Sequence, residues 1–210
     1  MRVIDRSEVR HAVAEVELTM LRNAQTGTAG FRAALRRLSR ILVCEATREL
    51  HTEDIPISTP MAPTTGSKLV FDVIVVEVLR AGLGMIDAFM DVIPGAKQGH
   101  IGLQRDEATA IASQYYCKFP PHIGPHNPVF LLDPMLATGG SCCDALKLIE
   151  ATGAEDITVI SVIAAQEGVD RVRREFPNVK IFTAAVDPIL DERKYIVPGL
   201  GDAGDRYCGT

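Results

Sequence analysis

The chain has 210 residues, of which 47% are hydrophobic and 23% are charged, a composition typical of a globular protein rather than of a disordered or fibrous one. This length suits one substantial hydrophobic core, so we expect a single domain over residues 1–210. The net charge of -5 argues against broad electrostatic binding to nucleic acid, although a local basic patch could still bind a small anion.

The cysteines indicate a reducing compartment. There are five, an odd number, and they form neither a CxxC pair nor the spacing of a metal site.

Residues 1–17 carry charges throughout and lack the apolar centre of a signal peptide. The longest apolar runs, such as 73–78, are far too short to span a bilayer. We therefore expect a cytoplasmic protein with no membrane partner.

Two helices are predicted in the N-terminal quarter. Apolar residues recur every three to four positions in 8–22, and residues 23–27 interrupt this pattern. Thr28 is a candidate N-cap for a second helix that continues to about Leu50. The alternating segment 55–60, bounded by prolines, then predicts an edge strand.

Strands and helices alternate in the rest of the chain. Because short β-branched or apolar runs are separated by helical patterns, we expect an α/β fold with a mostly parallel twisted sheet and helices on both faces. The irregular segment 104–128, rich in proline near its end, is expected to form an extended arm or loop. The expected strands are 73–78, 129–132, 157–164 and 179–185, and the expected helices are 84–90, 141–152 and 167–176.

Residues 129–141, which read VFLLDPMLATGGS, give the most informative pattern. Four apolar strand residues lead to Asp133, then to a loop, and then to a helix. This order puts ligand groups at the carboxyl edge of a parallel sheet, where open α/β folds bind ligands. Residues 138–141 would lie at the helix N-terminus, whose free N–H groups and dipole favour a phosphate. Asp133 would accept hydrogen bonds from ribose hydroxyls.

Each part of this pattern has a simpler interpretation. An aspartate after a strand is often only a turn or cap residue, and a Gly-Gly pair is often only a tight turn. The combination is therefore what carries the prediction. The segment contains neither GxxxxGK[ST] nor GxGxxG, which excludes a Walker A loop and a dinucleotide loop.

The sequence resembles the uracil phosphoribosyltransferases, whose loop for phosphoribosyl pyrophosphate (PRPP) looks like DPMLATGGS at 133–141. The resemblance covers essentially the whole chain. It continues in LRAGLGM at 79–85, YYCKFP at 115–120 and YIVPGLGDAGDRYCGT at 195–210, and more loosely in LTMLRNAQT and EATREL. It implies a phosphoribosyltransferase-like fold with an N-terminal helical preface and an extended arm. The implied reaction transfers the phosphoribosyl group of PRPP to uracil, giving UMP and pyrophosphate in pyrimidine salvage.

The arginines are the expected ligands of the pyrophosphate. Arg80 follows the strand 73–78, so it should emerge at the same sheet edge as Asp133, and its planar fork matches phosphate oxygens. In the family the arginines matching Arg80 and Arg105 contact pyrophosphate. By itself Arg105 would be interpreted as a solvated surface charge, and its surroundings, GLQRDEAT, lack the aromatic residue and second acid usual in relatives. Glu77 stands where many relatives carry a proline.

The Gly- and Asp-rich stretch PGLGDAGD follows the last strand and predicts a loop. Alone it could be a flexible tail or a cation site, although its acids lack EF-hand spacing. The resemblance makes it the base-recognition loop, in which backbone groups of Ile196, Gly201 and Ala203 contact uracil and Asp202 lies between base and ribose. Besides Arg80, Arg105, Asp133 and Asp202, the resemblance assigns to PRPP the loop residues Pro134, Met135, Leu136, Ala137, Thr138, Gly139, Gly140 and Ser141.

The implied reaction needs no covalent protein nucleophile, and Cys142 and Cys143 are interpreted as helix packing residues. We expect Mg²⁺ to be held mainly through PRPP, without a permanent protein site. Family members form dimers or larger homo-oligomers, and some respond to GTP. Two rivals remain open. One is another base or nucleoside enzyme on the same scaffold, such as one acting on a purine. The other is a non-catalytic nucleotide sensor, whose RNA-binding version the acidic charge disfavours.

Overall fold

A twisted seven-stranded sheet forms the centre of the computed structural model, which describes residues 8–105 and 112–210. The strands lie in the order β5-β4-β3-β6-β8. The short strand β7 pairs with β8 beyond the end of β6, and β9 pairs with the opposite edge of β8. All pairs are parallel except β4 with β5. The strands are β3 (Ile74–Leu79), β4 (Lys97–Arg105), β5 (Ala112–Lys118), β6 (Val129–Leu132), β7 (Met135–Leu136), β8 (Ile157–Ala165) and β9 (Lys180–Asp187).

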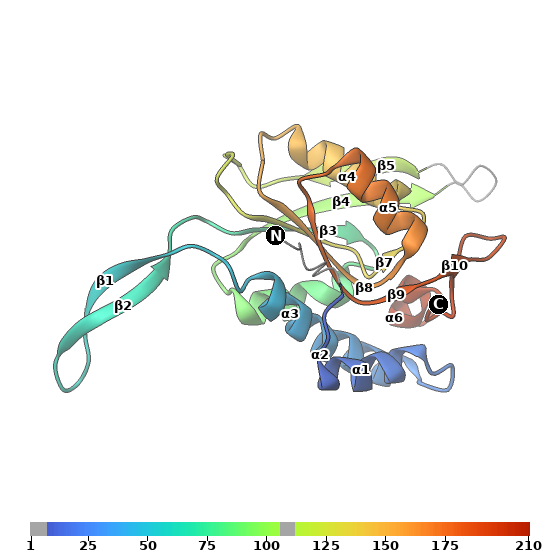
Figure 1. Cartoon of the computed structure of the whole chain (residues 1–210), viewed down its shortest axis with the longest axis horizontal. Helices are drawn as coiled ribbons and strands as arrows, with labels where there is room; N and C mark the ends of the chain where they lie inside the picture. Colours follow the sequence, from blue (N-terminus) through green and yellow to red (C-terminus); the bar gives the residue numbers. More distant parts are fainter. Residues whose placement is uncertain (1–7, 106–111) are drawn as a thin grey trace, which may run out of the picture.

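Helices cover both faces of this sheet (Figure 1). One face packs against α1 (Ala12–Arg22), α2 (Thr28–Ala46) and α3 (Leu83–Val92). The other packs against α4 (Gly140–Glu150) and α5 (Gln166–Glu175). Because both faces are covered, the central strands are apolar runs without alternation, and all nine residues of β8 are buried.

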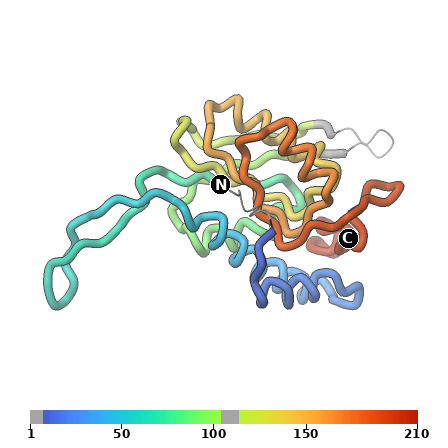
Figure 2. The backbone as a smooth tube through the Cα atoms, viewed as in Figure 1, coloured from blue at the N-terminus to red at the C-terminus, as the bar shows by residue number. Residues whose placement is uncertain are grey.

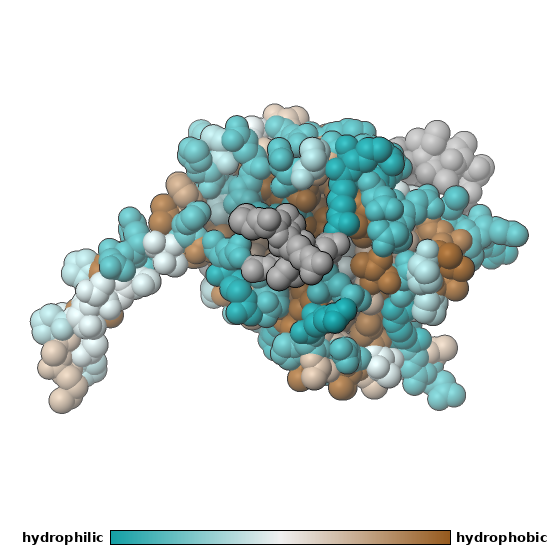
Figure 3. Space-filling model, viewed as in Figure 1, coloured by the Kyte–Doolittle hydropathy of each residue, from teal (hydrophilic) through white to brown (hydrophobic). Residues whose placement is uncertain are grey.

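A two-stranded hairpin projects from this body. It consists of β1 (Thr52–Ser58) and β2 (Pro63–Leu69), paired antiparallel, and Figure 2 shows it reaching far beyond the helices. Most of its residues are exposed, as expected for a ribbon that packs on neither face of the sheet. Figure 3 shows that the rest of the visible face is largely hydrophilic.

The C-terminal segment packs beside the end of β9. A short hairpin of β10 (Ile189–Leu190) and β11 (Ile196–Val197) leads through a loop to α6 (Ala203–Cys208). Figure 1 shows α6 above α1 and α2. The loop and the helix therefore connect the edge of the sheet to the N-terminal helices.

The sheet and its crossover helices confirm the predicted fold class, and the four predicted strands and three later helices are present within a few residues of their expected ends. The first helix begins at Ala12 rather than at residue 8, because Glu8 forms a bridge with Thr183 of β9. Thr28 is the first residue of α2, so its prediction as the N-cap is wrong; Gly27 holds that position, without a side-chain cap. This helix ends at Ala46, before Leu50.

Three predictions for irregular segments need correction. The strand expected at 55–60 belongs to the separate hairpin, whose second strand was not predicted. Of the described residues in 104–128, those at 119–128 are loop, because 104–105 belong to β4 and 112–118 form β5, which pairs with β4. Residues 106–111 lie outside the described part. The C-terminal stretch is a loop only as far as Asp202, which caps α6.

Within residues 8–105 and 112–210, no helix combines the length and the apolar character needed to cross a bilayer. The two hydrophobic clusters lie on opposite faces of one sheet. This arrangement supports the single domain expected over residues 1–210, which stays a prediction.

Candidate functional site

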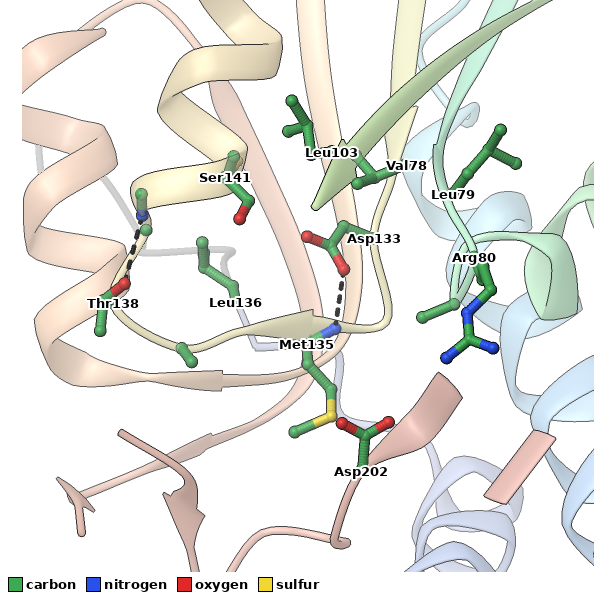
Figure 4. A pocket seen from close by; sticks show the side chains of 15 residues that line it. Val78, Leu79, Arg80, Leu103, Asp133, Met135, Leu136, Thr138, Ser141 and Asp202 are labelled. Atoms are coloured by element: carbon green, nitrogen blue, oxygen red, sulfur yellow. Dashed lines mark hydrogen bonds between the residues drawn. The ribbon is translucent and has the colours of Figure 1, made fainter. Parts of the chain in front are cut away.

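A cavity of about 280 Å³ opens at the carboxyl edge of the sheet (Figure 4). Its walls come from the ends of β3 and β6, from the loop that contains β7, and from the first turn of α4. Asp202, at the start of α6, contributes from the C-terminal segment. The cavity thus collects residues that are more than 100 positions apart in the chain, at the edge where parallel α/β sheets bind their ligands.

The loop before α4 has the geometry of a phosphate site. Gly139, the N-cap of α4, has φ of +77°, which a residue with a side chain adopts only at a cost. A Cβ there would also lie 3.1 Å from the carbonyl oxygen of Gly168, so the turn needs glycine. The next amide, of Gly140, lies 3.4 Å from Thr138 Oγ1. Gly140 and Ser141, the first residues of α4, line the cavity, so the helix end whose N–H groups lack partners within the helix lies beside it, as anion binding requires.

Asp133 lies directly after β6, and its backbone is held firmly in the sheet. Its N–H donates to Ile160, and its carbonyl accepts a 2.6 Å hydrogen bond from Ser161 Oγ. The side chain accepts one hydrogen bond, from the Met135 N–H at 3.3 Å. Burial raises the pKa of the carboxyl group to about 6, and the Met135 hydrogen bond opposes this shift only in part. The carboxylate therefore has acceptor capacity left for a ligand.

Arg80 lies in the turn between β3 and α3, after a cis Leu79–Arg80 peptide. Its side chain is 60% exposed, and its guanidinium lies 3.6 Å from the carboxylate of Asp205. Figure 4 shows the guanidinium on the side of the cavity where Asp202 lies. At this exposure the ion pair is weak, so the guanidinium can exchange it for a phosphate.

The proposed base loop reaches the cavity through Asp202. One oxygen of this carboxylate accepts the N–H of Asp205 at 2.9 Å and so caps α6. Ile196 and Ala203 are buried, whereas Gly201 is exposed with φ of +80°. These three residues flank the cavity without lining it.

Most of the predicted PRPP residues line this cavity, Pro134 does not, and the prediction for Arg105 is not tested by the described side chains. Pro134 is buried behind Asp133, and its carbonyl accepts the N–H groups of Val162 and Ile163, which is a structural role. Arg105 ends β4, and its side chain lies outside the described part of the structure. The predicted residues that line the cavity are Arg80, Asp133, Met135, Leu136, Ala137, Thr138, Gly139, Gly140, Ser141 and Asp202.

Five further residues line the cavity: Val78, Leu79, Ala81, Leu103 and Cys142. Leu79 and Ala81 belong to LRAGLGM and Val78 directly precedes it, so proximity to that segment could have indicated all three, whereas nothing in the sequence marks Leu103. Burial raises the pKa of the Cys142 thiol well above its ordinary value, with Asp133 adding to the effect. Cys142 is therefore a protonated thiol near neutral pH, and its packing on the sheet agrees with the structural role predicted for it.

Glu77 lies three residues before Arg80, at the centre of β3. Only 1% of the residue is exposed, and its Oε1 lies 2.9 Å from His100 Nδ1 on the neighbouring strand β4. Its Oε2 is buried without a hydrogen-bond partner among the described residues. Burial raises the pKa of this carboxyl group, and the contact with His100 opposes the shift. Glu77 therefore lies under the site without facing the cavity.

The acidic side chains of the cavity suit a metal ion that takes most of its ligands from a bound substrate. Among the described residues, no group of three or more His, Cys, Asp or Glu could hold a metal ion. The carboxylates of Asp133 and Asp202 are the acidic groups of the cavity lining. Carboxylate oxygens suit Mg²⁺, which commonly takes its remaining ligands from phosphates and water.

Comparisons with known proteins agree with this geometry. The family model described as "Uracil phosphoribosyltransferase" matches residues 8–210. A uracil phosphoribosyltransferase of Corynebacterium diphtheriae is 48% identical over 201 residues, which cover 96% of this chain and 95% of the relative. The corresponding Clostridium botulinum enzyme is 43% identical, with 97% of each chain covered.

Solved structures share this fold. The AQ2163 protein from Aquifex aeolicus is 34% identical and superposes with a TM-score of 0.91, covering 95% of this chain and 96% of the other. An adenine phosphoribosyltransferase from Thermoanaerobacter pseudethanolicus shares the fold at a TM-score of 0.50 and 13% identity, covering 76% and 83% of the two chains. Together, the model match, the relatives and the geometry of the cavity show that the chain belongs to the uracil phosphoribosyltransferase family.

Proposed function

We propose that this chain transfers the phosphoribosyl group of PRPP to a ring nitrogen of uracil, giving UMP and pyrophosphate. The observation that carries the proposal is one cavity that brings together the glycine turn before α4, the carboxylate of Asp133 and the exposed guanidinium of Arg80, beside the C-terminal loop. These groups match the three anionic or hydroxylated parts of PRPP.

Each part of PRPP has a proposed protein ligand. The 5′-phosphate binds the backbone N–H groups of the loop 138–141, where the dipole of α4 adds its positive end. The ribose hydroxyls donate to Asp133, whose carboxylate has spare acceptor capacity. The pyrophosphate binds Arg80, whose side chain is 60% exposed. Arg105 remains a second proposed pyrophosphate ligand on the resemblance alone.

The reaction breaks the bond between the ribose C1′ and a pyrophosphate oxygen, and the electron pair of that bond leaves with pyrophosphate. A ring nitrogen of uracil forms its bond to the same carbon and loses its proton, which passes to the leaving pyrophosphate or to solvent. The centre gains oxocarbenium character and the leaving group is strongly anionic, so the protein contributes mainly by fixing charges in place. Asp133 would lie under the ribose and Arg80 against the leaving group. No protein nucleophile is involved, in agreement with the raised pKa of Cys142.

Mg²⁺ would be bound mainly by the phosphate oxygens of PRPP, with Asp133 and Asp202 as the carboxylates within the cavity lining. Its chemistry there is to neutralise charge on the leaving pyrophosphate. The role of the protein residues would be to bind and orient PRPP.

The C-terminal loop would select the base through backbone groups. Uracil presents a carbonyl oxygen, a ring N–H and a second carbonyl oxygen, a pattern that backbone groups of Ile196, Gly201 and Ala203 can match. The comparisons favour uracil over a purine, because relatives named for uracil are 43–48% identical over almost the whole chain. The adenine enzyme shares only the fold.

A direct assay tests the proposal. Purified protein is mixed with PRPP, Mg²⁺ and one free base at a time, and released pyrophosphate is measured, with EDTA as the control for metal. We expect turnover with uracil and none with adenine, hypoxanthine or guanine. Turnover with a purine instead would support the purine enzyme, and binding of UMP without any turnover would support the nucleotide sensor.

Association into a homo-oligomer, a response to GTP and a cytoplasmic location rest on the resemblance and composition, and stay predictions. Analytical ultracentrifugation and the same assay with added GTP measure the first two.

A further inference from the structure

Gly199, in the middle of the proposed base loop, is held through both of its backbone polar groups. Its N–H donates to Oδ2 of Asp187 at 2.9 Å, and its carbonyl accepts a hydrogen bond from the Arg22 guanidinium at 2.9 Å. Arg22 and Asp187 also bind each other in a two-pronged ion pair, with distances of 2.8 and 2.6 Å. The three residues form a closed network.

The network joins distant parts of the chain. Arg22 is the last residue of α1, Asp187 is the last residue of β9, and they are 165 positions apart. The Asp187 side chain is only 6% exposed and that of Arg22 24% exposed, so water competes weakly for these hydrogen bonds. Bidentate pairing fixes direction as well as distance.

We propose that Arg22 and Asp187 are positioning residues for base recognition, an inference that rests on the base-reading role proposed above for the loop 196–203. Neither residue lines the cavity. They act through Gly199, which lies between the two backbone segments proposed to read uracil, at Ile196 and at 201–203. The pair fixes the orientation of the peptide groups on both sides of Gly199.

The conformation of Gly199 makes this control tight. Its φ is +59°, and a Cβ at this position would lie 2.0 Å from the Ile196 carbonyl oxygen, so the turn folds directly onto Ile196. A shift of the Gly199 peptide would therefore move the Ile196 carbonyl, one of the groups proposed to contact the base. The conformation itself is one that glycine adopts readily, which leaves the hydrogen bonds to hold it.

A second arginine secures the next residue. Arg206 of α6 donates to the Leu200 carbonyl at 2.8 Å, to the Asn23 carbonyl at 2.8 Å, and also to the Leu21 carbonyl. Its guanidinium lies over the ring of Phe31, 4.4 Å from the centroid. The loop is thus tied at Gly199 and Leu200 to the C-terminal end of α1, as the position of α6 above α1 in Figure 1 indicates.

The chain offers a matched control for a test of this pair. Arg37 makes a bidentate ion pair with Glu17, at 2.6 and 2.8 Å, and Glu17 also lies on α1 with a side chain only 9% exposed. This second pair joins α1 to α2, and its hydrogen bonds involve no residue of the loop 196–203. Arg37→Lys should therefore reproduce the loss of a bidentate guanidinium–carboxylate pair without affecting the base loop.

The experiment compares Arg22→Lys, Asp187→Asn, their double variant and Arg37→Lys with the parent. KM is measured for uracil at saturating PRPP and for PRPP at saturating uracil, and hydrogen–deuterium exchange is followed in the peptide covering 196–203. Because each single variant weakens charge-assisted hydrogen bonds in a desolvated network, we expect KM for uracil to rise about ten- to hundredfold. KM for PRPP should stay within about twofold, because Arg80, Asp133 and the loop 138–141 lie on other elements and Asp202, the proposed PRPP ligand within the base loop, is held separately as the cap of α6. Hydrogen–deuterium exchange in the loop should accelerate. The rise in KM for uracil in the double variant should be smaller than the product of the rises in the two single variants.

The outcomes separate the two hypotheses. A parent that fails to use uracil overturns the proposed function and this inference with it. A parent that uses uracil, with variants that match it in KM for uracil and in loop exchange, overturns the inference alone. Equal rises in the two KM values, or the same rise in Arg37→Lys, would indicate a merely structural role and would also overturn it. If Arg22→Lys fails to fold, as judged by thermal melting, Asp187→Asn carries the same test.

Discussion

Replacing Asp133 by asparagine should make the free protein more stable at neutral pH and, at the same time, impair its use of PRPP. The reason for the first effect is that burial disfavours the ionised carboxylate of Asp133, so the free protein is less stable when this group is charged. Burial raises the pKa of this carboxyl group from its ordinary 3.8 to about 6. Asparagine keeps the size of the side chain and the oxygen that accepts the Met135 N–H.

The size of the effect follows from linkage. A pKa raised in the folded state means that the protonated form stabilises the fold; this contribution is complete below the unfolded pKa and is lost as pH rises through about 6. A shift from 3.8 to about 6 corresponds to on the order of 3 kcal/mol. For a chain of this length, that is a melting temperature roughly 6–12 °C higher for Asp133→Asn at pH 8, with little difference near pH 4.

Thermal melting of the parent and Asp133→Asn, from pH 4 to pH 8, measures this. Asp170→Asn is the matched control, because Asp170 is an exposed aspartate on α5 that accepts a hydrogen bond from Gln166. Its melting temperature should follow that of the parent at every pH. A difference between Asp133→Asn and the parent that stays constant with pH would refute the argument that desolvation raises the Asp133 pKa.

The same variant tests the ribose role. An ionised Asp133 only accepts hydrogen bonds, whereas asparagine also carries an NH₂ group that would face the ribose hydroxyls. Loss of a charge-assisted hydrogen bond should lower kcat/KM for PRPP about ten- to hundredfold. In the parent, kcat/KM should also fall below pH 6 as the carboxylate is protonated, and Asp133→Asn should lack this component. Turnover equal to that of the parent would contradict the proposed role.

Three further predictions concern other residues. Arg80→Ala should lower kcat/KM for PRPP more than Arg80→Lys, because lysine keeps the charge but loses the fork; equal rates would contradict bidentate binding. Glu77→Gln should stabilise the protein increasingly as pH rises, because burial raises the Glu77 pKa and its stabilising contribution is lost on ionisation; melting curves that track those of the exposed control Glu150→Gln would refute this. Cytosine should be rejected by a factor on the order of 10⁴ relative to uracil, because it leaves buried backbone groups unpaired, and comparable turnover of the two bases would overturn the role of the base loop.

The core of the site could be predicted because its signals are local. In VFLLDPMLATGGS a buried strand, an acid, a glycine turn and a helix follow each other within 13 positions, and the parallel sheet brings that segment and Arg80 to one edge. The family resemblance added the C-terminal loop, which a single Gly- and Asp-rich stretch could not have identified. Within that loop, α6 was missed because it is six residues long and begins among glycines and acids that favour turns.

The sequence by itself determined the fold class, the sheet edge that carries the cavity and most residues of the cavity lining, because each depends on periodicity or on neighbours along the chain. Tertiary structure decided the rest. The strand β4 has the polar, glycine-containing sequence KQGHIGLQR, and only pairing with β3 and β5 makes it a strand. The raised pKa of Asp133 arises from burial that no local pattern reveals. The network of Arg22, Asp187 and Gly199 joins residues up to 177 positions apart, and hydrogen bonds over that separation exist only once the chain has folded.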